Sequence, residues 1–500
     1  MSRTVTRRQA LTMGLGLVIG VPILAACGAS APASSAPTAA GANAPAVAPT
    51  VSAPTGLVAP QGNIAAPAAA ATTAPQSAAQ PQAAAPGQTV IRVMKFAGVG
   101  WEQDNKFGDE FAKANPKIQV KYEDIVYGEM YQKNLALGAT GTLADLFAGH
   151  NKWMPYLAYK KLTLDLDSLT KTHASEIKFD DFFPSVIADA KHIGVDGKLY
   201  WLPTVVHPAG NAIVMFNVDL LKKAGLEPPK TSDWTLSDFE QIVRKAANPK
   251  GGIYGTKIEV GSPLYAQQYT RTWGSDPKKG SEDAWLLAAD GKKQQLASPP
   301  VKEAFEWYWK LIKDGLVPLA DAAPPGQGGD FFTAGQMVSQ AAVIGQEAAN
   351  KEKIADKFQV KSVLWPKGPH GYRGSCLSYN TYAANAKTKT PEETFMLLNA
   401  LTGPEAGLWA SIEGHANPYA RHSVWSNPKL WDKWPVTKDA LDWFDSGIDS
   451  FPQPENLRFP EWLDAWSQNT SNYLNAKENW DQMYPHTQKA CQDILDQPRP

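Results

Sequence analysis

Residues 215–226 read MFNVDLLKKAGL, and a Pro-Pro pair follows at 228–229. Residues 219–225 predict a short helix, because Gly225 tolerates the left-handed conformation in which helices commonly end. The two prolines beyond it cannot continue a helix. The order of elements on either side of this helix then indicates the fold class.

Towards the N-terminus, strand and helix patterns alternate. Residues 90–96 (VIRVMKF) are rich in β-branched side chains, and residues 118–122 and 143–147 are similar short apolar runs, so all three predict strands. Between the first two runs, Phe107 and Phe111 lie one helical turn apart. This strand–helix–strand order predicts α/β layers with a largely parallel sheet.

Towards the C-terminus, two further helices are predicted. Thr235 is a good N-cap, Asp238 completes a capping box with it, and residues 236–243 carry an apolar stripe. A second stripe at helical spacing lies within residues 301–312. The chain from residue 89 onward has about 410 residues, more than a single hydrophobic core usually supports, so two lobes are expected.

Motifs around the helix predicted for residues 219–225 resemble those of a known family. Residues 197–203 (GKLYWLP), 215–226 and 233–235 (DWT) are similar to the signature of bacterial extracellular solute-binding proteins of ABC importers, in particular the large maltose-binding-like class that binds sugars. Phe216 and Gln336 depart from the pattern, where tyrosine and lysine are usual. Three more blocks extend the resemblance over most of 89–425: FTAGQM at 332–337, LWPKGP at 364–369 and TPEETFMLL at 390–398.

The resemblance implies a two-lobe periplasmic-binding-protein fold of type II, in which hinge crossovers join two α/β lobes and the ligand binds in the cleft between them. By analogy, the crossovers lie near residues 205–212, 374–376 and 414–417. The lobes are then made of four segments: residues 89–206 and 375–413 in the N-terminal lobe, and residues 207–374 and 414–500 in the C-terminal lobe.

Composition favours a sugar as the ligand. The chain has 17 Trp, 16 Tyr and 17 Phe, and aromatic rings offer flat apolar partners for the C–H faces of sugars. The net charge of −1 provides no broad basic field for a nucleic acid. We expect a monomer that binds a carbohydrate and has ABC permease subunits as its partner.

Metal and cofactor chemistry is not expected. No Cys/His cluster with metal-ligand spacing occurs in the sequence. Downstream of Cys27 only Cys376 and Cys491 are present, and the sequence leaves open whether they form a disulfide.

Loops that follow strands are where open α/β sheets bind ligands, so polar and aromatic residues there are candidate ligand-binding residues. Trp101 would stack on a sugar and Glu102 would accept hydrogen bonds from hydroxyl groups, although both also suit a helix start. For His207, in the first crossover, a structural role in the hinge is an equal alternative. The candidates are Trp101, Glu102, His150, Asn151, Trp153, His207, Tyr265, Gln268, Gln346 and Arg373.

Catalytic motifs are missing from the sequence. It contains no GxSxG, HExxH or GxxxxGK[ST] pattern, so an enzyme is not expected. Glycoside hydrolysis needs only two opposed carboxylates, and 49 acidic residues leave that reaction open on composition. An anchored carbohydrate-active enzyme and a ligand-binding subunit of a sensor kinase therefore stay as alternatives to the importer receptor.

Residues 1–26 predict a cleaved signal peptide. Three arginines among the first eight residues precede an uncharged apolar core that is too short to span a membrane. LAAC at 24–27 matches the bacterial lipobox, so Cys27 is expected to carry lipid and anchor an extracytoplasmic protein at the cell membrane. TRRQAL at 6–11 also resembles a twin-arginine signal, and the Sec and twin-arginine export routes both stay open.

Residues 27–88 join the lipidation site to the globular part. Residues 28–88 contain no charged side chain and are mostly Ala, Pro, Ser, Thr, Gly and Gln. Such a composition cannot recover the entropy cost of ordering, so a disordered linker is predicted.

Overall fold

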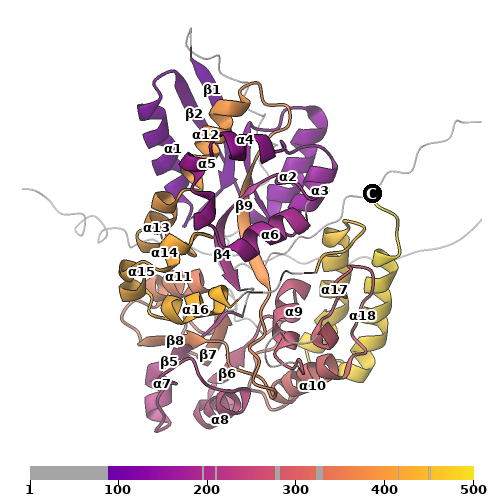
Figure 1. Cartoon of the computed structure of the whole chain (residues 1–500). Coiled ribbons are helices and arrows are strands. Elements are labelled where there is room, and N and C mark those ends of the chain that lie inside the picture. Colours follow the sequence, from indigo (N-terminus) through magenta and orange to yellow (C-terminus); the bar gives the residue numbers. More distant parts are fainter. Residues whose placement is uncertain are drawn as a thin grey trace, which may run out of the picture. The chain divides into compact units, whose positions relative to one another are not determined.

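The structure is a computed structural model built around two β-sheets that are covered by helices (Figure 1). It describes residues 88–500 with these gaps: 99, 194–195, 209–210, 276–281, 323–329, 415, 447, 449 and 451. The predicted signal peptide, Cys27 and the linker up to residue 87 lie outside the described residues. None of the described helices is both long and apolar enough to span a membrane.

The first sheet has five strands in the order β2-β1-β3-β9-β4. These strands are β1 (Thr89–Phe96), β2 (Ile118–Ile125), β3 (Leu146–His150), β4 (Leu202–Pro208) and β9 (Leu377–Ala384). All residues of β3, β4 and β9 are buried. The elements around this sheet are α1 (Glu102–Ala114), α2 (Tyr127–Thr140), α3 (Met154–Tyr159), α4 (Asp167–Thr172), α5 (Ala174–Ile177), the 3-10 turn η1 (Phe179–Asp181), α6 (Pro184–His192), α12 (Pro391–Leu401) and α13 (Pro404–Ile412).

The strands predicted near the N-terminus are present. The predictions for 90–96 and 118–122 are confirmed as β1 and β2, which pair in parallel. The third strand begins at Leu146 rather than at Leu143. Leu143 is already buried, so the apolar run that suggested a strand includes the end of the preceding turn.

The second sheet has four strands in the order β6-β7-β5-β8. These are β5 (Ile213–Asn217), β6 (Tyr254–Lys257), β7 (Met337–Ala342) and β8 (Val360–Leu364). The remaining helices are α7 (Val218–Lys223), α8 (Leu236–Ala246), α9 (Pro263–Arg271), α10 (Pro299–Lys313), α11 (Ile344–Ile354), α14 (His422–Trp425), α15 (Pro428–Lys433), α16 (Val436–Asp445), α17 (Phe459–Leu474) and α18 (Trp480–Leu495), with 3-10 turns η2 (Pro249–Gly251) and η3 (Glu282–Ala284).

Both faces of the second sheet are covered, as the central strand β5 shows. Its side chains alternate: Ile213 and Met215 belong to the hydrophobic cluster of the first sheet, and Val214 and Phe216 belong to a second cluster. Residues of α11 and α16 lie in the first cluster, whereas those of α8, α10, α17 and α18 lie in the second. A strand buried on both faces is therefore apolar throughout, which explains the run IVMF.

The two helices predicted near the quoted motif are confirmed. Gly225, just beyond α7, has a φ of 67°, the left-handed conformation that ends the helix. Thr235 caps α8, and the Asp238 side chain completes the capping box. The stripe within 301–312 is confirmed as α10.

The prediction of a largely parallel sheet is confirmed in strand direction, because a single described strand in each sheet, β9 in the first and β5 in the second, runs against the others. Of the seven strand pairings in the described chain, three are parallel and four are antiparallel. In the first sheet only β9 is reversed, because it comes from the second sheet and starts where β4 ends: Pro208 pairs with Leu377. The carboxyl ends of β1, β3 and β4 therefore lie at the same sheet edge as the start of β9.

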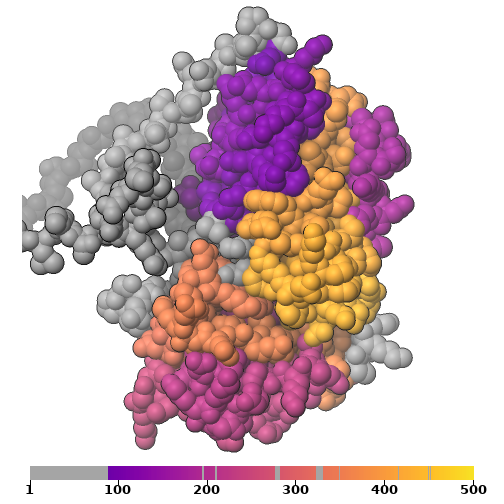
Figure 2. Space-filling model, turned by 90° about the vertical axis from the view of Figure 1, so that its left-hand side faces the viewer, coloured from indigo at the N-terminus to yellow at the C-terminus, as the bar shows by residue number. Residues whose placement is uncertain are grey.

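The chain passes between the sheets more than once. It leaves the first sheet after Pro208, enters the second at Ile213, and returns between Leu364 and Leu377. The segment from α13 to α16 contacts both sides, since α13 packs on α1 and α16 packs on β8. Figure 2 shows this segment, in orange to yellow, beside the indigo residues that surround the first sheet. The exact lobe boundaries stay a prediction.

The two cysteines of the described chain do not form a disulfide. Cys376 and Cys491 are both free and buried. Burial raises the pKa of each thiol to about 12. Both therefore behave as small apolar core residues rather than as reactive groups.

Candidate functional site

The turn after β3 contains three candidate ligand-binding residues, His150, Asn151 and Trp153, together with Lys152. The Trp153 N–H donates to the His150 carbonyl at 3.0 Å, and the Lys152 N–H donates to His150 Nδ1 at 3.2 Å. Helix α3 starts immediately afterwards with Pro155 in its first turn, where proline is favourable. All four residues from 150 to 153 are at most 7% exposed. The fold thus buries a polar segment at the edge where β3 ends.

Aromatic rings surround this turn. The Trp153 ring centroid lies 5.6 Å from that of Tyr127 and 5.5 Å from that of His150. Tyr127, the first residue of α2, lies 4.9 Å from Phe96, and Phe96 lies 4.8 Å from Trp101. The structure therefore brings the candidates Trp101, His150 and Trp153 together through two rings from β1 and α2.

Lys152 lies among these rings. Its Nζ is 5.2 Å from the Tyr127 ring centroid and 4.9 Å from the Trp153 ring centroid, which allows cation–π contact. Burial lowers the pKa of Lys152 to about 7. No described carboxylate forms an ion pair with it. A buried ammonium without a counter-charge is unfavourable, so this group stands out chemically.

His150 and His207 flank β9 at the same edge. His150 pairs with Asn380 and His207 pairs with Ser378 in the strand register. His150 Nε2 lies 3.2 Å from Ser378 Oγ, and His207 Nδ1 donates to the Pro208 carbonyl at 3.0 Å. Burial, and then the charge of Lys152, place the pKa of His150 well below its usual range, and burial lowers that of His207 to about 4.

We call this set the edge cluster. Its members are Phe96, Trp101, Tyr127, His150, Asn151, Lys152, Trp153 and His207.

Several buried polar atoms in or beside the edge cluster have no hydrogen-bond partner. They include Asn151 Oδ1, Trp153 Nε1 and Asn380 Oδ1. Leaving such an atom unpaired costs about 1–3 kcal/mol, so clusters of them indicate a place for a polar molecule. The edge cluster thus combines flat rings with available donors and acceptors.

Residues from other parts of the chain approach the edge cluster. Tyr265, on α9, lies near Tyr127. Burial raises the pKa of Tyr127, and the charge of Tyr265 raises it further. The Asn211 side chain holds this helix by donating to the Tyr265 carbonyl at 3.3 Å. The Gln453 side chain donates to the Asn151 carbonyl at 2.8 Å. A helix that packs in the second hydrophobic cluster therefore approaches the edge cluster, which lies at the first sheet.

Residues 106–438 match the family described as bacterial extracellular solute-binding protein. This chain belongs to that family. No curated protein sequence matches the chain.

Solved structures of solute-binding proteins share the fold. A substrate-binding protein from Listeria monocytogenes is 19% identical, with a TM-score of 0.62, 82% of this chain covered and 97% of that one. The GacH receptor of Streptomyces glaucescens is 17% identical, with a TM-score of 0.64 and coverages of 82% and 99%. A solute-binding protein from Agrobacterium vitis is 21% identical, with a TM-score of 0.61 and coverages of 81% and 98%. The predicted two-lobe fold is confirmed.

Two candidates, Gln268 and Arg373, are engaged in main-chain contacts in this solute-binding protein. Gln268 Nε2 donates to the Gly374 carbonyl at 2.7 Å and to the Asn211 carbonyl at 3.4 Å. The Arg373 guanidinium donates to the carbonyls of Trp365 and Ser232. The two segments that connect the sheets, 208–213 and 364–377, are thereby attached to α9 and to the loop that contains Ser232. We call Gln268 and Arg373 the passage residues.

Gln346 and Glu102 are not members of the edge cluster, although Glu102 follows its member Trp101 in the chain. Gln346 is in the first turn of α11, where the neighbouring Gly345 N–H donates to Asn417 Oδ1 at 2.6 Å. Glu102 is exposed at the start of α1, and its carboxylate accepts a hydrogen bond from the Gly100 N–H at 2.8 Å. No described contact joins either side chain to the edge cluster.

Sequence reasoning did not select Tyr127 and Lys152, which the structure places in the edge cluster. Tyr127 begins the helix after β2, so the rule that selected loops after strands also applied to it. Lys152 lies inside the candidate segment, but a lysine in a loop usually indicates a solvated side chain. Only the three-dimensional packing shows that it is buried.

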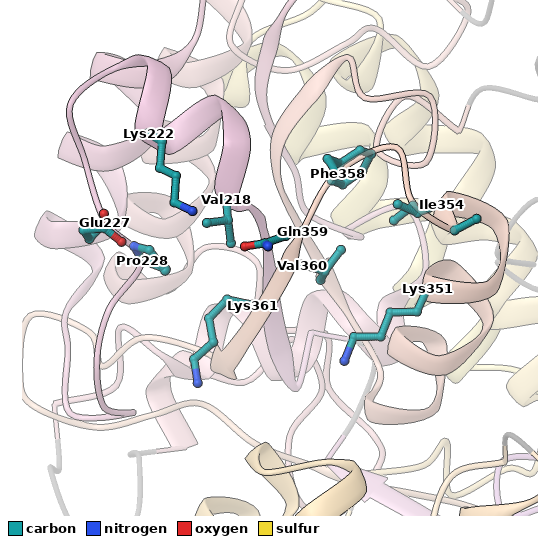
Figure 3. Close-up of a pocket in the computed structure, with 11 residues that line it drawn as sticks. Val218, Lys222, Glu227, Pro228, Lys351, Ile354, Phe358, Gln359, Val360 and Lys361 are labelled. Atoms are coloured by element: carbon teal, nitrogen blue, oxygen red, sulfur yellow. The ribbon is translucent and has the colours of Figure 1, made fainter.

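A separate pocket of about 640 Å³ lies beside β8 (Figure 3). Figure 3 shows Lys222 of α7, Lys351 of α11 and Lys361 of β8 around Gln359 and Val360. The pocket shares no residue with the edge cluster. Lys351 is ion-paired with Glu347 at 2.7 Å, so part of its charge is already compensated.

Proposed function

We propose that this solute-binding protein captures a sugar or oligosaccharide outside the cytoplasm and delivers it to an ABC permease. The observation that carries the proposal is the edge cluster, in which aromatic rings lie beside unpartnered donors and acceptors. Sugar rings need both kinds of partner: flat apolar surfaces for C–H faces and fixed polar atoms for hydroxyl groups.

The ligands of structural relatives support the same class of molecule. The Listeria protein is in complex with cycloalternan, the GacH receptor was solved with acarbose, and the Agrobacterium protein has bound D-mannitol. All three ligands are rich in hydroxyl groups. Two of these proteins are described as belonging to ABC transporters, which supports a permease as partner.

Capture would couple ligand binding to lobe closure. The edge cluster belongs to the first sheet and Tyr265 to a helix of the second, so a ligand between them would contact both lobes. The passage residues would hold the connecting segments while the lobes rotate about them. No bond of the ligand needs to change in this process, so the protein is proposed to be a receptor and not an enzyme.

The predicted tether completes the proposal. Lipidation of Cys27 and the linker over 27–88 would keep a monomeric receptor next to its permease. Mass spectrometry of the protein purified from membranes tests this step: a diacylglyceryl-modified Cys27 at the new N-terminus is expected. A mature chain that begins elsewhere and carries no lipid contradicts it.

A thermal-shift screen of the mature chain against mono- and oligosaccharides, polyols, amino acids and peptides tests the ligand class. A ligand at 100 times its dissociation constant stabilises the native state by about 2.7 kcal/mol. At least one carbohydrate is expected to raise the melting temperature, with the ligand recovered unchanged by chromatography. A shift only with a non-carbohydrate, or release of a cleavage product, overturns the proposal.

A further inference from the structure

Three basic groups gather in the edge cluster. Lys152 lies close enough to His150 and His207 that its charge lowers the pKa of both. The three residues come from the ends of two strands that flank β9, so the fold and not chance surface proximity holds them together. All three are buried: His150 is 4% exposed, Lys152 is 7% exposed and His207 is 8% exposed.

No described carboxylate compensates these groups. Asp104, the acidic residue at the start of α1, accepts a hydrogen bond from Tyr382, and Asp189 accepts one from Tyr379. Asp124 on β2 is ion-paired with Lys95 at 2.6 Å. Among the described residues, none of His150, Lys152 and His207 forms an ion pair with a carboxylate. A positive charge on Lys152 would therefore have no carboxylate partner among the described residues.

The available donors suit a carboxylate in particular. Lys152 Nζ has no hydrogen-bond acceptor among the described residues, and Trp153 Nε1 has none either. These two donors belong to adjacent residues, and a carboxylate has two oxygens that each accept a hydrogen bond. Charge-assisted hydrogen bonds of this kind are stronger than those to a neutral hydroxyl group.

We propose that the sugar captured by this protein carries a carboxylate, as uronic acids do, and that the carboxylate binds at Lys152 and Trp153 beside His150 and His207. The inference rests on the proposed function and narrows its ligand to acidic sugars. The rings of Tyr127 and Trp153 would contact the sugar, while Lys152 supplies the charge that a neutral sugar does not need.

Titration calorimetry on the mature chain tests this inference with matched ligands. D-galacturonate and D-glucuronate and their disaccharides are compared with the corresponding neutral sugars, which differ by a CH₂OH group in place of the carboxylate. At least one acid is expected to bind ten or more times tighter than its neutral partner, with affinity that weakens as salt concentration rises. Galactose 6-phosphate and glucose 6-phosphate form a third arm.

The variant Lys152→Met removes the ammonium and keeps an apolar stem between the rings. It is expected to abolish the preference for the acid, whereas Lys152→Arg retains much of it. The matched control is Lys160→Met, because Lys160 also lies over a tyrosine ring, 5.9 Å from the Tyr156 centroid, but is exposed. This control is expected to leave the preference intact, and circular dichroism checks the folding of each variant.

The outcomes separate the two claims. A neutral sugar that binds as tightly as its acid, or a sugar phosphate that binds when both uronates fail, overturns the carboxylate inference while the sugar receptor stands. If no sugar of any charge binds, the proposed function fails as well. A preference for the acid that survives in Lys152→Met contradicts the assignment of the site.

Discussion

The edge cluster and the passage residues are both buried and polar, yet their hydrogen bonding differs. At the passages, the side-chain N–H groups of Gln268 and Arg373 donate to main-chain carbonyls, although Gln268 Oε1 has no partner. In the edge cluster, Asn151 and Trp153 keep polar atoms without any partner. The donors of Gln268 and Arg373 are used within the protein, whereas Trp153 Nε1 in the edge cluster is a buried donor without an acceptor. Burial alone therefore does not distinguish a site residue from a structural one.

The largest effect is expected at Arg373. Replacing it in Arg373→Met removes charge-assisted hydrogen bonds to two carbonyls and the stacking of the guanidinium on Trp443, 5.6 Å away. The free energy of unfolding should fall by about 3–5 kcal/mol, which urea denaturation measures. Arg244→Met is the control, since Arg244 forms partly exposed pairs with Glu240 and Asp314, and its loss should cost about 1 kcal/mol or less. Equal losses in both variants would contradict the structural role of Arg373.

The next largest effect is the pH dependence of the free energy of unfolding, to which His207 of the edge cluster contributes. Burial lowers the pKa of His207 to about 4, below the value of about 6.5 expected in the unfolded chain. The unfolded state then binds the proton first, so the native state loses up to about 3 kcal/mol as pH falls from 6.5 to 4. His207→Gln should flatten this part of the stability–pH curve, and His192→Gln, at an exposed position, should leave it unchanged. A wild-type slope in His207→Gln would show that this histidine is not buried as described.

A smaller loss of stability is expected at Gln268. In Gln268→Leu the carbonyls of Gly374 and Asn211 lose their donor, which should lower the free energy of unfolding by about 1–3 kcal/mol. Gln241→Leu on the exposed face of α8 is the control and should have little effect. If Gln268→Leu instead leaves stability unchanged but abolishes ligand binding, Gln268 is a site residue and the distinction drawn here fails.

The smallest change in stability is expected at Trp153. Trp153→Phe removes the unpartnered Nε1–H and keeps an aromatic ring, so unfolding should change by less than about 1.5 kcal/mol. Ligand affinity should fall by roughly 2- to 12-fold, the value of one hydrogen bond of about 0.5–1.5 kcal/mol. Trp466→Phe, whose Nε1 already donates to the Val260 carbonyl, should show the reverse pattern.

Local patterns predicted the elements of this fold well. The capping box at Thr235 and the glycine at 225 depend on neighbouring residues only, and both helices formed as expected. The direction of β9 could not be read in this way, because it depends on where the chain re-enters the first sheet. The family motifs supplied the two-lobe arrangement that the periodicity alone left undetermined.

The site was less predictable than the fold. The excess of tryptophan suggested a carbohydrate, but Trp201, Trp365 and Trp466 are fully buried in the cores. The rule for loops after strands selected the segment from 150 to 153, and the structure places that segment at the sheet edge where β3 ends. It did not show that the Lys152 charge is buried or that Arg373 is fully engaged, since both facts depend on contacts between distant segments.

The most direct test of the central claim is hydrogen exchange measured by mass spectrometry on the mature chain, with and without the carbohydrate identified by the thermal-shift screen. The account predicts that ligand-dependent protection is concentrated in the peptides that cover 127–131, 149–153 and 265–268. Protection concentrated instead around the pocket of Figure 3, at 218–228 and 351–361, with the 149–153 peptide unchanged, would contradict it.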